Sequence, residues 1–130
     1  MTDADVVEWL YERAAVGLPA DADMGRMEKA VEAASLDVRR QVVEGLVQRT
    51  ADRCAAACPG CGRRLLMHVR GRRRRVVTRC GPIRFRRDYG RCPACGRYSY
   101  PADVALGLHE RAPASPVVQE ICALETLAAP

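Results

Sequence analysis

Aromatic residues and long apolar runs are both scarce in this chain of 130 residues. One Trp, one Phe and four Tyr make up all the aromatics, so any core must consist mostly of Val, Leu and Ala. No apolar run approaches the ~20 residues that a helix needs to span a bilayer. The N-terminus, MTDADVVEWLYERAA, is acidic and lacks the basic start and the apolar centre of a secretory signal. These absences predict a soluble, cytoplasmic protein with no membrane partner.

Acidic residues are almost missing from one stretch of the chain, and lysine is almost missing from all of it. Residues 63–91 carry twelve Arg and only one acid, Asp88, for a net charge of +11. Residues 1–57 carry a net charge of −4 and residues 92–130 one of −2, so the positive charge is confined to the middle. Coding bias can explain twenty Arg against one Lys, but it does not remove acids from twenty-nine residues. A field this one-sided favours a polyanionic partner.

Composition divides the chain into three expected parts, enough for one small domain with helical flanks. A helical N-terminal region is expected over residues 1–56, and short antiparallel strands broken by Gly and Pro are expected over residues 57–108. Residues 109–130 are interpreted as a linker and the start of a C-terminal helix. The predicted fold class is therefore α+β.

The helical parts carry start signals. Apolar spacing predicts helices over residues 4–16 and 21–34, and a third helix that begins at Ser35 and fades near Cys54. In the last part, Ser115-Pro116 stand at a cap position and a first helical position. A helix that is only beginning when the chain stops suggests the front part of something longer.

Seven cysteines need an explanation in a reducing compartment, where C-x-x-C spacing indicates metal or redox chemistry rather than disulfides. Four of them form two matching C-P-x-C-G turns, Cys58–Gly62 and Cys92–Gly96. Two such turns supply four thiolates for a tetrahedral site, and their glycines allow a positive φ just after the second thiolate. Residues 57–108 are therefore predicted to be a zinc ribbon. Its single structural Zn2+ would be held by Cys58, Cys61, Cys92 and Cys95.

Other uses of the cysteines stay open. A rubredoxin-like iron site has very similar spacing, although an arginine-loaded insert suits an electron carrier poorly. A thioredoxin-like redox pair needs one C-x-x-C within a βαβ unit, and none is visible. Cys54 is a weaker candidate ligand and more simply a free or buried thiol. Cys80 and Cys122 are interpreted as small hydrophobes, and His68 and His109 as structural or surface histidines.

The stretch RRVVTRCGPIRFRRDY predicts a β-hairpin that turns at Cys80-Gly81. In that register Thr78 pairs with Ile83 and Val76 pairs with Phe85. These side chains form a face that can pack on a core. A slip of one residue would exchange the two faces of the hairpin.

The opposite face of the hairpin would carry a basic ridge. There the predicted register pairs Arg75 with Arg86 and Val77 with Arg84. Like charges directly opposite one another are destabilising, which is easier to understand if a polyanion neutralises them; a merely solvated ridge is the alternative. Arginine also matches phosphate with two parallel hydrogen bonds and can reach guanine edges. The predicted nucleic-acid contacts are Arg72, Arg73, Arg74, Arg75, Arg79, Arg84, Arg86 and Arg87.

Several motifs follow one another in an order that resembles a known family. They are Cys58–Gly62, Val76–Gly81, Ile83–Tyr89, Cys92–Gly96, Pro101–Leu108 and Ser115–Pro116. This order is similar to that of the N-terminal zinc-ribbon region of ISKra-type insertion-sequence transposases, over about residues 25–127. The resemblance implies a DDE transposase whose catalytic carboxylates lie on an RNase H-like domain further downstream. Asp103 matches a structural aspartate of that pattern, and no acid here matches a catalytic one.

The expected function is a zinc-ribbon DNA-binding module that recognises mobile-element DNA and is not an enzyme by itself. Self-association through the N-terminal helices is a further expectation. The alternatives are a zinc-dependent protein-interaction module, a rubredoxin-like electron carrier and a transcription-type zinc ribbon.

Overall fold

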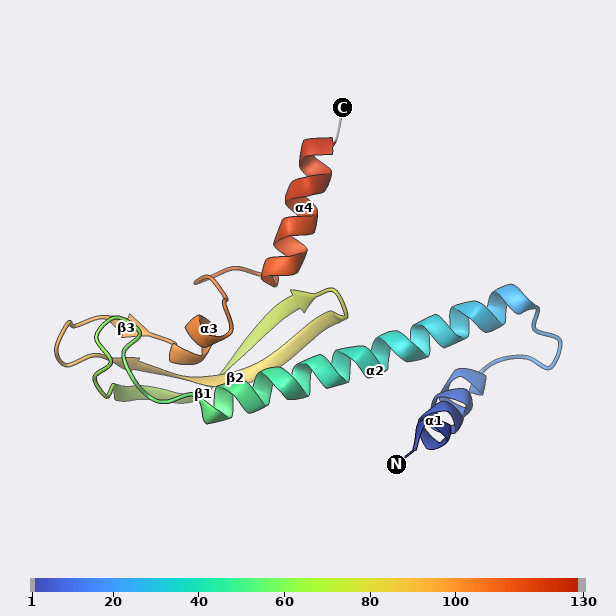
Figure 1. Ribbon diagram of the computed structural model, residues 1–130, viewed down its shortest axis with the longest axis horizontal. Helices are drawn as coiled ribbons and strands as arrows, with labels where there is room; N and C mark the ends of the chain where they lie inside the picture. Colours follow the sequence, from blue (N-terminus) through green and yellow to red (C-terminus); the bar gives the residue numbers. More distant parts are fainter. Residues whose placement is uncertain (1, 129–130) are drawn as a thin grey trace.

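Helices occupy both ends of the chain and an antiparallel sheet its middle, which makes the fold α+β as predicted. The computed structural model describes residues 2–128; Met1 and residues 129–130, the outer ends of the expected first and last parts, lie outside it. The sheet has the strand order β1-β2-β3. Figure 1 shows α2 running along the sheet and beyond it, with α1 beside its far half. The elements are α1 (Asp3–Ala15), α2 (Met24–Arg53), β1 (Leu66–Thr78), β2 (Gly81–Arg91), β3 (Tyr98–Ser99), α3 (Pro101–Ala105) and α4 (Pro116–Ala128).

Capping side chains fix the starts of the two N-terminal helices. At α1, Thr2 and Asp5 form a capping box in which the Asp5 carboxylate accepts from the Thr2 backbone N–H at 2.8 Å. At α2, the Asp23 carboxylate accepts from the Arg26 backbone N–H at 2.8 Å. None of the helices in the described residues is both long and apolar enough to cross a bilayer.

α2 is one continuous helix of 30 residues, so the prediction of two helices separated at Ser35 is wrong. Ser35 lies inside the helix, eleven residues after its start at Met24. A serine can cap a helix only where the chain enters it from an extended conformation, and the alanine-rich residues before Ser35 favour helix instead. No proline interrupts residues 24–53.

The β1–β2 hairpin turns one residue earlier than predicted. Thr78 pairs with Gly81, which leaves Arg79 and Cys80 as the loop. The Thr78 hydroxyl donates to the Gly81 carbonyl oxygen at 2.8 Å and accepts from the Cys80 N–H at 3.1 Å. Gly81 has a φ of 103°, a conformation open to glycine, which explains why the turn ends there.

Every predicted cross-strand pair is therefore wrong by two positions. The observed pairs are Val77–Pro82, Val76–Ile83, Arg75–Arg84, Arg74–Phe85, Arg73–Arg86 and Arg72–Arg87. A shift of two positions moves no side chain to the other face, because side chains alternate with a period of two. The prediction that Val76, Ile83 and Phe85 share one face therefore agrees with the structure, where all three are buried. We call this the inner face of the hairpin and its opposite the outer face.

Two separate clusters of buried residues hold the sheet. The first lies under the inner face near the hairpin turn, where α2 and the segment after α3 pack on it. Its members are Val76, Ile83 and Phe85, with Val43, Val47, Ala51, Leu106 and Leu108 against them. The second cluster lies at the other end of the sheet and contains Cys58, Leu65 and Cys92. One end of the sheet thus has a core that α2 and the segment after α3 cover, and the other end has a core built around cysteines.

Hydrogen-bonding groups cover part of each edge of the hairpin. Along β2, the Gln48 side-chain amide accepts from the Arg86 N–H at 2.8 Å and donates to the Arg86 carbonyl oxygen at 3.0 Å. Glu44 accepts from the Arg84 N–H at 3.0 Å. Along β1, Val77 exchanges backbone bonds of 2.9 Å with the segment from Pro113 to Ser115. α2 and this segment therefore fix the hairpin between them.

Candidate metal centre and nucleic-acid interface

The two C-P-x-C-G turns form matching loops, which we call the knuckles (Cys58–Gly62 and Cys92–Gly96). In each, the first cysteine donates its backbone N–H to a carbonyl five residues on, at 2.7 Å in one knuckle and 2.8 Å in the other. In each, the glycine N–H donates back to the carbonyl of the first cysteine, at 2.9 and 2.8 Å. The glycines have φ values of 77° and 71°, as the sequence predicted. Identical local chemistry thus presents two pairs of thiols in the same way.

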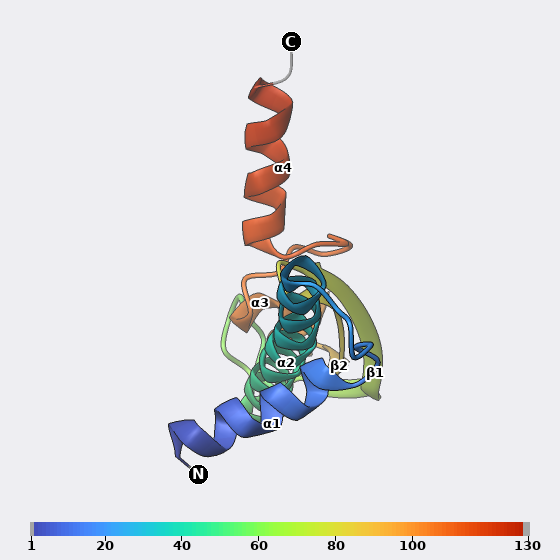
Figure 2. The same ribbon diagram turned by 90° about the vertical axis from the view of Figure 1, so that its right-hand side faces the viewer.

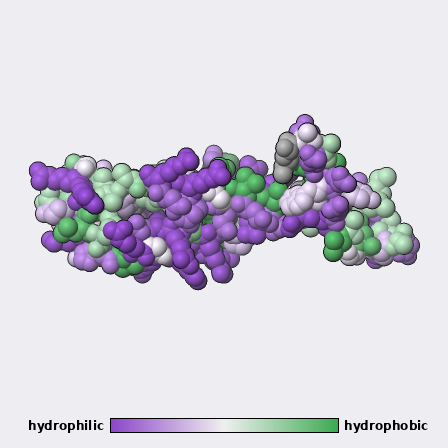
Figure 3. Space-filling view, turned by 90° about the horizontal axis from the view of Figure 1, so that it is seen from below, coloured by the Kyte–Doolittle hydropathy of each residue, from purple (hydrophilic) through white to green (hydrophobic). Residues whose placement is uncertain are grey.

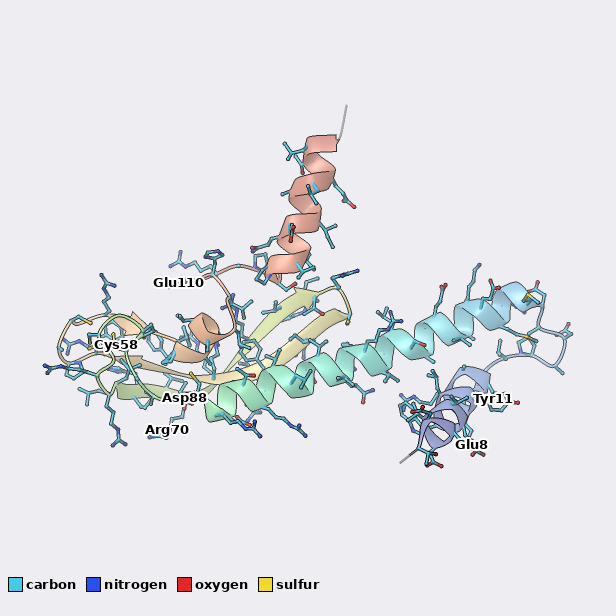
Figure 4. All side chains as sticks on the ribbon, viewed as in Figure 1. Glu8, Tyr11, Cys58, Arg70, Asp88 and Glu110 are labelled. Carbon is cyan, nitrogen blue, oxygen red and sulfur yellow. The ribbon has the colours of Figure 1, made fainter. Side chains whose placement is uncertain are left out.

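The four thiols of the knuckles converge on one point. Their sulfur atoms all lie within 4.8 Å of one another. The Cys58–Cys95 and Cys61–Cys92 sulfur pairs are separated by 3.5 and 3.4 Å, close to the ~3.8 Å edge of a tetrahedron with Zn–S bonds of ~2.3 Å. Cys58, labelled in Figure 4, lies at the end of the sheet that is farthest from α1. The four cysteines could therefore hold one metal ion.

The joint between the first knuckle and β2 is very close. A Cβ atom added to Gly90 would lie 2.8 Å from the Leu66 carbonyl oxygen and 3.1 Å from the Leu65 Cβ. No side chain fits there, so glycine lets the two strands approach and brings the knuckles together.

Backbone donors already favour thiolates at the buried positions. The Cys95 N–H holds the pKa of Cys92 at about 6, well below the ordinary value. The N–H groups of Cys61 and Gly60 likewise lower the pKa of Cys58. The Cys92 thiol raises the pKa of Cys95 to about 11, because neighbouring sulfurs cannot all carry negative charge. A cation between the sulfurs would remove this conflict, so the donor set fits a metal ion.

The remaining cysteines lie outside the cluster. Cys54 ends α2 and is half-buried, and Cys80 is half-buried in the hairpin turn. Cys122 is exposed on α4. His68 is exposed and contacts the Tyr98 ring at a centroid distance of 5.3 Å, and His109 is exposed.

The structure sorts the eight predicted arginines into two groups. Four lie on the outer face as two directly opposed pairs, Arg75 with Arg84 and Arg73 with Arg86, and all four are exposed. Arg79 is exposed in the turn and Arg72 is exposed at the edge of the inner face. Within residues 2–128, these six side chains form no ion pair. Figure 3 shows long hydrophilic side chains over the part of the molecule that contains the hairpin.

Arg74 and Arg87 occupy a different environment. Both guanidinium groups are about nine-tenths buried and meet the equally buried Asp103 of α3, at 2.7 Å from Arg74 and 3.2 Å from Arg87. Arg74 also donates to the carbonyls of His109 and Ala112, at 2.9 and 2.8 Å. Their donors are already used inside the protein, so these two arginines are not available to a phosphate in this conformation.

Arg87 is held by three further groups that sequence reasoning missed. It donates to the carbonyls of Arg72 and Arg73, each at 3.0 Å, and its guanidinium lies 3.8 Å from the centre of the Tyr100 ring. Tyr100 in turn contacts Tyr89, with ring centroids 4.6 Å apart. The only available sequence signal was the even spacing of Arg87 with the buried Ile83 and Phe85.

Asp88, the single acid among the arginines, has a local task. Two irregularities interrupt the pairing of β1, between Met67 and Val69 and between Val69 and Arg72. At the second, Gly71 has a φ of 65° and donates its N–H to the Asp88 carboxylate at 2.8 Å. Asp88 thus stabilises a β-bulge and does not pair with an arginine. Figure 4 places Asp88 and Arg70 together beside this part of the hairpin.

No known protein family, curated protein or solved structure matches the chain.

Proposed function

We propose that the protein is a zinc-dependent DNA-binding module that holds DNA with the outer face of its hairpin. The observation that carries the proposal is the pair of opposed arginine pairs on one exposed face, together with Arg72 and Arg79 nearby. Side chains directly opposite on antiparallel strands lie about 5 Å apart, so these cations repel one another unless an anion lies between them. Arginine binds phosphate oxygens with two parallel hydrogen bonds, which suits a DNA backbone.

Zinc is the metal that we propose for the knuckles. Four thiolates in a closed tetrahedral set are the usual ligands of structural zinc, which supplies folding energy and no open coordination position. Once bound, the ion would tie the first knuckle to the end of β2. The chain's own residues then do the rest: the knuckles anchor the end of the hairpin, α2 fixes its edge, and the arginines contact phosphate.

The resemblance to ISKra-type transposases supports mobile-element DNA as the target. On this proposal the module recognises DNA in the cytoplasm and does not cut or join it, since none of its acids matches a catalytic carboxylate of that family. Arg74 and Arg87 are left out of the proposed contacts because Asp103 holds them. The proposed contact residues are Arg72, Arg73, Arg75, Arg79, Arg84 and Arg86.

The experiment starts with the metal content of protein purified without added metal. One zinc per chain supports the proposal, whereas iron would favour the rubredoxin-like alternative. Binding to a generic DNA duplex is then measured over a range of salt concentrations. Neutralising about six phosphates gives a slope near −5 for log K against log salt, at about 0.9 per phosphate. A slope near zero would rule out the arginine contacts.

Two variants separate the parts of the proposal. Cys58→Ser should remove the metal and unfold the knuckles, because binding of structural zinc is coupled to folding. Arg75→Ala with Arg84→Ala should keep the metal but lower the salt slope by about two. Competition with an acidic peptide distinguishes the protein-interaction alternative. If the acidic peptide binds the protein and generic duplex DNA does not displace it, the arginines serve a protein and not a nucleic acid.

A further inference from the structure

The chain exposes far more surface than a compact protein of its mass. Its accessible surface is 9685 Å2, whereas the size scaling of folded monomers gives about 6,800 Å2 for 14.3 kDa. The excess of about 2,900 Å2 is more than the ~800 Å2 that each partner buries in a standard protein interface. Figures 1 and 2 show where it arises: α1, the far half of α2, and α4 all extend away from the sheet.

The α1–α2 end contains an apolar groove with almost no core beneath it. In α1 only Ala14 is buried, and in α2 no residue is. The groove has a volume of about 470 Å3 and an almost wholly apolar lining. Several of its side chains are largely exposed, including Tyr11 at 71% and Val7 at 66%. The lining residues are Val7, Leu10, Tyr11, Ala14, Ala15, Leu18, Met27 and Val31.

We infer that this groove is the interface of a homodimer, in which the α1–α2 pairs of two copies form a four-helix bundle. Two helices cannot enclose an apolar stripe, but two such pairs can, and a two-fold arrangement places the same residues of each copy in the groove of the other. Figure 4 shows Tyr11 pointing away from α1 and away from the sheet, where a second copy can reach it.

Charge favours a second copy over other occupants. α1 carries four acids and one Arg, a net charge of −3, which opposes nucleic acid and anionic lipid. The start of α2, residues 24–31, carries Arg26 and Lys29 against Glu28, a net charge of +1. When α1 of one copy lies against the start of α2 of the other, the acidic helix meets the basic turn. The same contact occurs twice in a two-fold dimer.

The dimer is tested by sedimentation equilibrium of the full, metal-loaded chain from about 1 µM to about 100 µM. The apparent mass should rise from 14.3 kDa toward twice that value. Tyr11→Glu places a charge in the groove and should weaken the dimer at least about tenfold. Val16→Glu is the matched control, because it adds the same charge at a position that is 82% exposed and does not line the groove.

The outcomes separate cleanly. A monomer at every concentration overturns the dimer and leaves the groove to a different kind of partner. Equal weakening by Tyr11→Glu and Val16→Glu also overturns it, because net charge and not the groove would then govern association. Metal content and the salt slope for DNA are measured on the same samples. The dimer does not depend on DNA binding, so either idea can fail without the other.

Discussion

Arg74 and Arg75 are neighbours on one strand and have opposite environments. Arg74 faces inward, where its guanidinium is about nine-tenths buried against Asp103. Arg75 faces outward, exposed and directly opposite Arg84. The same division separates Arg87, which is buried, from Arg86, which is exposed. The arginines of this run therefore do not share one environment. Side chains alternate along a strand, which divides the arginines into an internal set and a set that is available to a partner.

Asp103 balances the charge of the internal set. One buried carboxylate faces two guanidinium groups, and the remaining donors of both arginines reach backbone carbonyls. On the outer face, the exposed Asp88 accepts from the Gly71 N–H, and within the described residues it forms no ion pair with an arginine. The internal arginines thus fasten α3 and the following segment to the sheet, and the outer ones remain free for a partner.

The largest expected effect comes from losing the proposed metal ion, which tests whether the two sets of arginines stay separate when the knuckles unfold. Metal binding needs thiolates, and the pKa of Cys92 is about 6. A pKa lowered from 9.0 to about 6 means that, without metal, the thiolate stabilises the fold fully above about pH 9 and loses this stabilisation as the pH falls through about 6. A bound cation stabilises the thiolates further, so we expect metal release below about pH 6, measured with a chromogenic chelator. Retention of the full metal content at about pH 4 would contradict the thiolate site.

Acid release should not disorganise the whole sheet at once. The cluster of Cys58, Leu65 and Cys92 is separate from the one under the inner face. Hydrogen exchange should therefore show early loss of protection in the knuckles and later loss in residues 72–78 of β1. Simultaneous loss in both regions would mean that the two clusters unfold as one unit.

The next largest effect should follow Asp103→Asn, which breaks the internal set. Two buried guanidinium groups would lose the one acid that pairs with them within residues 2–128, a change that typically costs ~3–5 kcal/mol of unfolding free energy. Urea unfolding of the metal-loaded protein measures it. Asp88→Asn is the matched control, because Asp88 is exposed and its asparagine can still accept from the Gly71 N–H. Similar losses in the two variants would remove the distinction between the faces.

The smallest effect on stability, and one of opposite sign, is expected for Arg75→Glu. Replacing one of two opposed like charges by an acid should stabilise the hairpin by ~0.2–1 kcal/mol in urea unfolding. The same change should weaken DNA binding and lower the salt slope, since a phosphate contact is lost and a repulsive charge is added. A loss of stability would show that Arg75 has a structural role that its exposure does not reveal.

What could be predicted from the sequence is what depends on local geometry. The pair of thiols in each knuckle and the left-handed glycine after it follow from C-x-x-C spacing, which acts within a single turn, and the meeting of the two knuckles follows from the four ligands that a tetrahedral metal site needs. The two faces of the hairpin follow from alternation, and they were correct even though the register was not. The register depends on which residue closes the turn, and the hydrogen bonds of Thr78 decided that in favour of Gly81.

What could not be predicted depends on contacts between distant parts of the chain. Asp103 lies 29 residues from Arg74 and 16 from Arg87, and nothing in the arginine run shows which members it will hold. The length of α2 was missed because serine is a common capping residue. Capping also requires the chain to enter the helix from an extended conformation, which it does not do at Ser35. In the sequence, Glu44 and Gln48 look like ordinary surface residues, because only the folded structure shows that β2 lies beside them.

Those two side chains have a wider consequence. A strand with a bare edge can accept a strand from another molecule, and extended basic hairpins gathered along one polyanion would be brought close enough to do so. Here Gln48 occupies the edge of β2 much as a neighbouring strand would, and the segment from Pro113 to Ser115 occupies the edge of β1 at Val77. The edge of β2 at Arg84 and Arg86 and the edge of β1 at Val77 are therefore already occupied within the chain, which leaves less free edge for a strand of another copy.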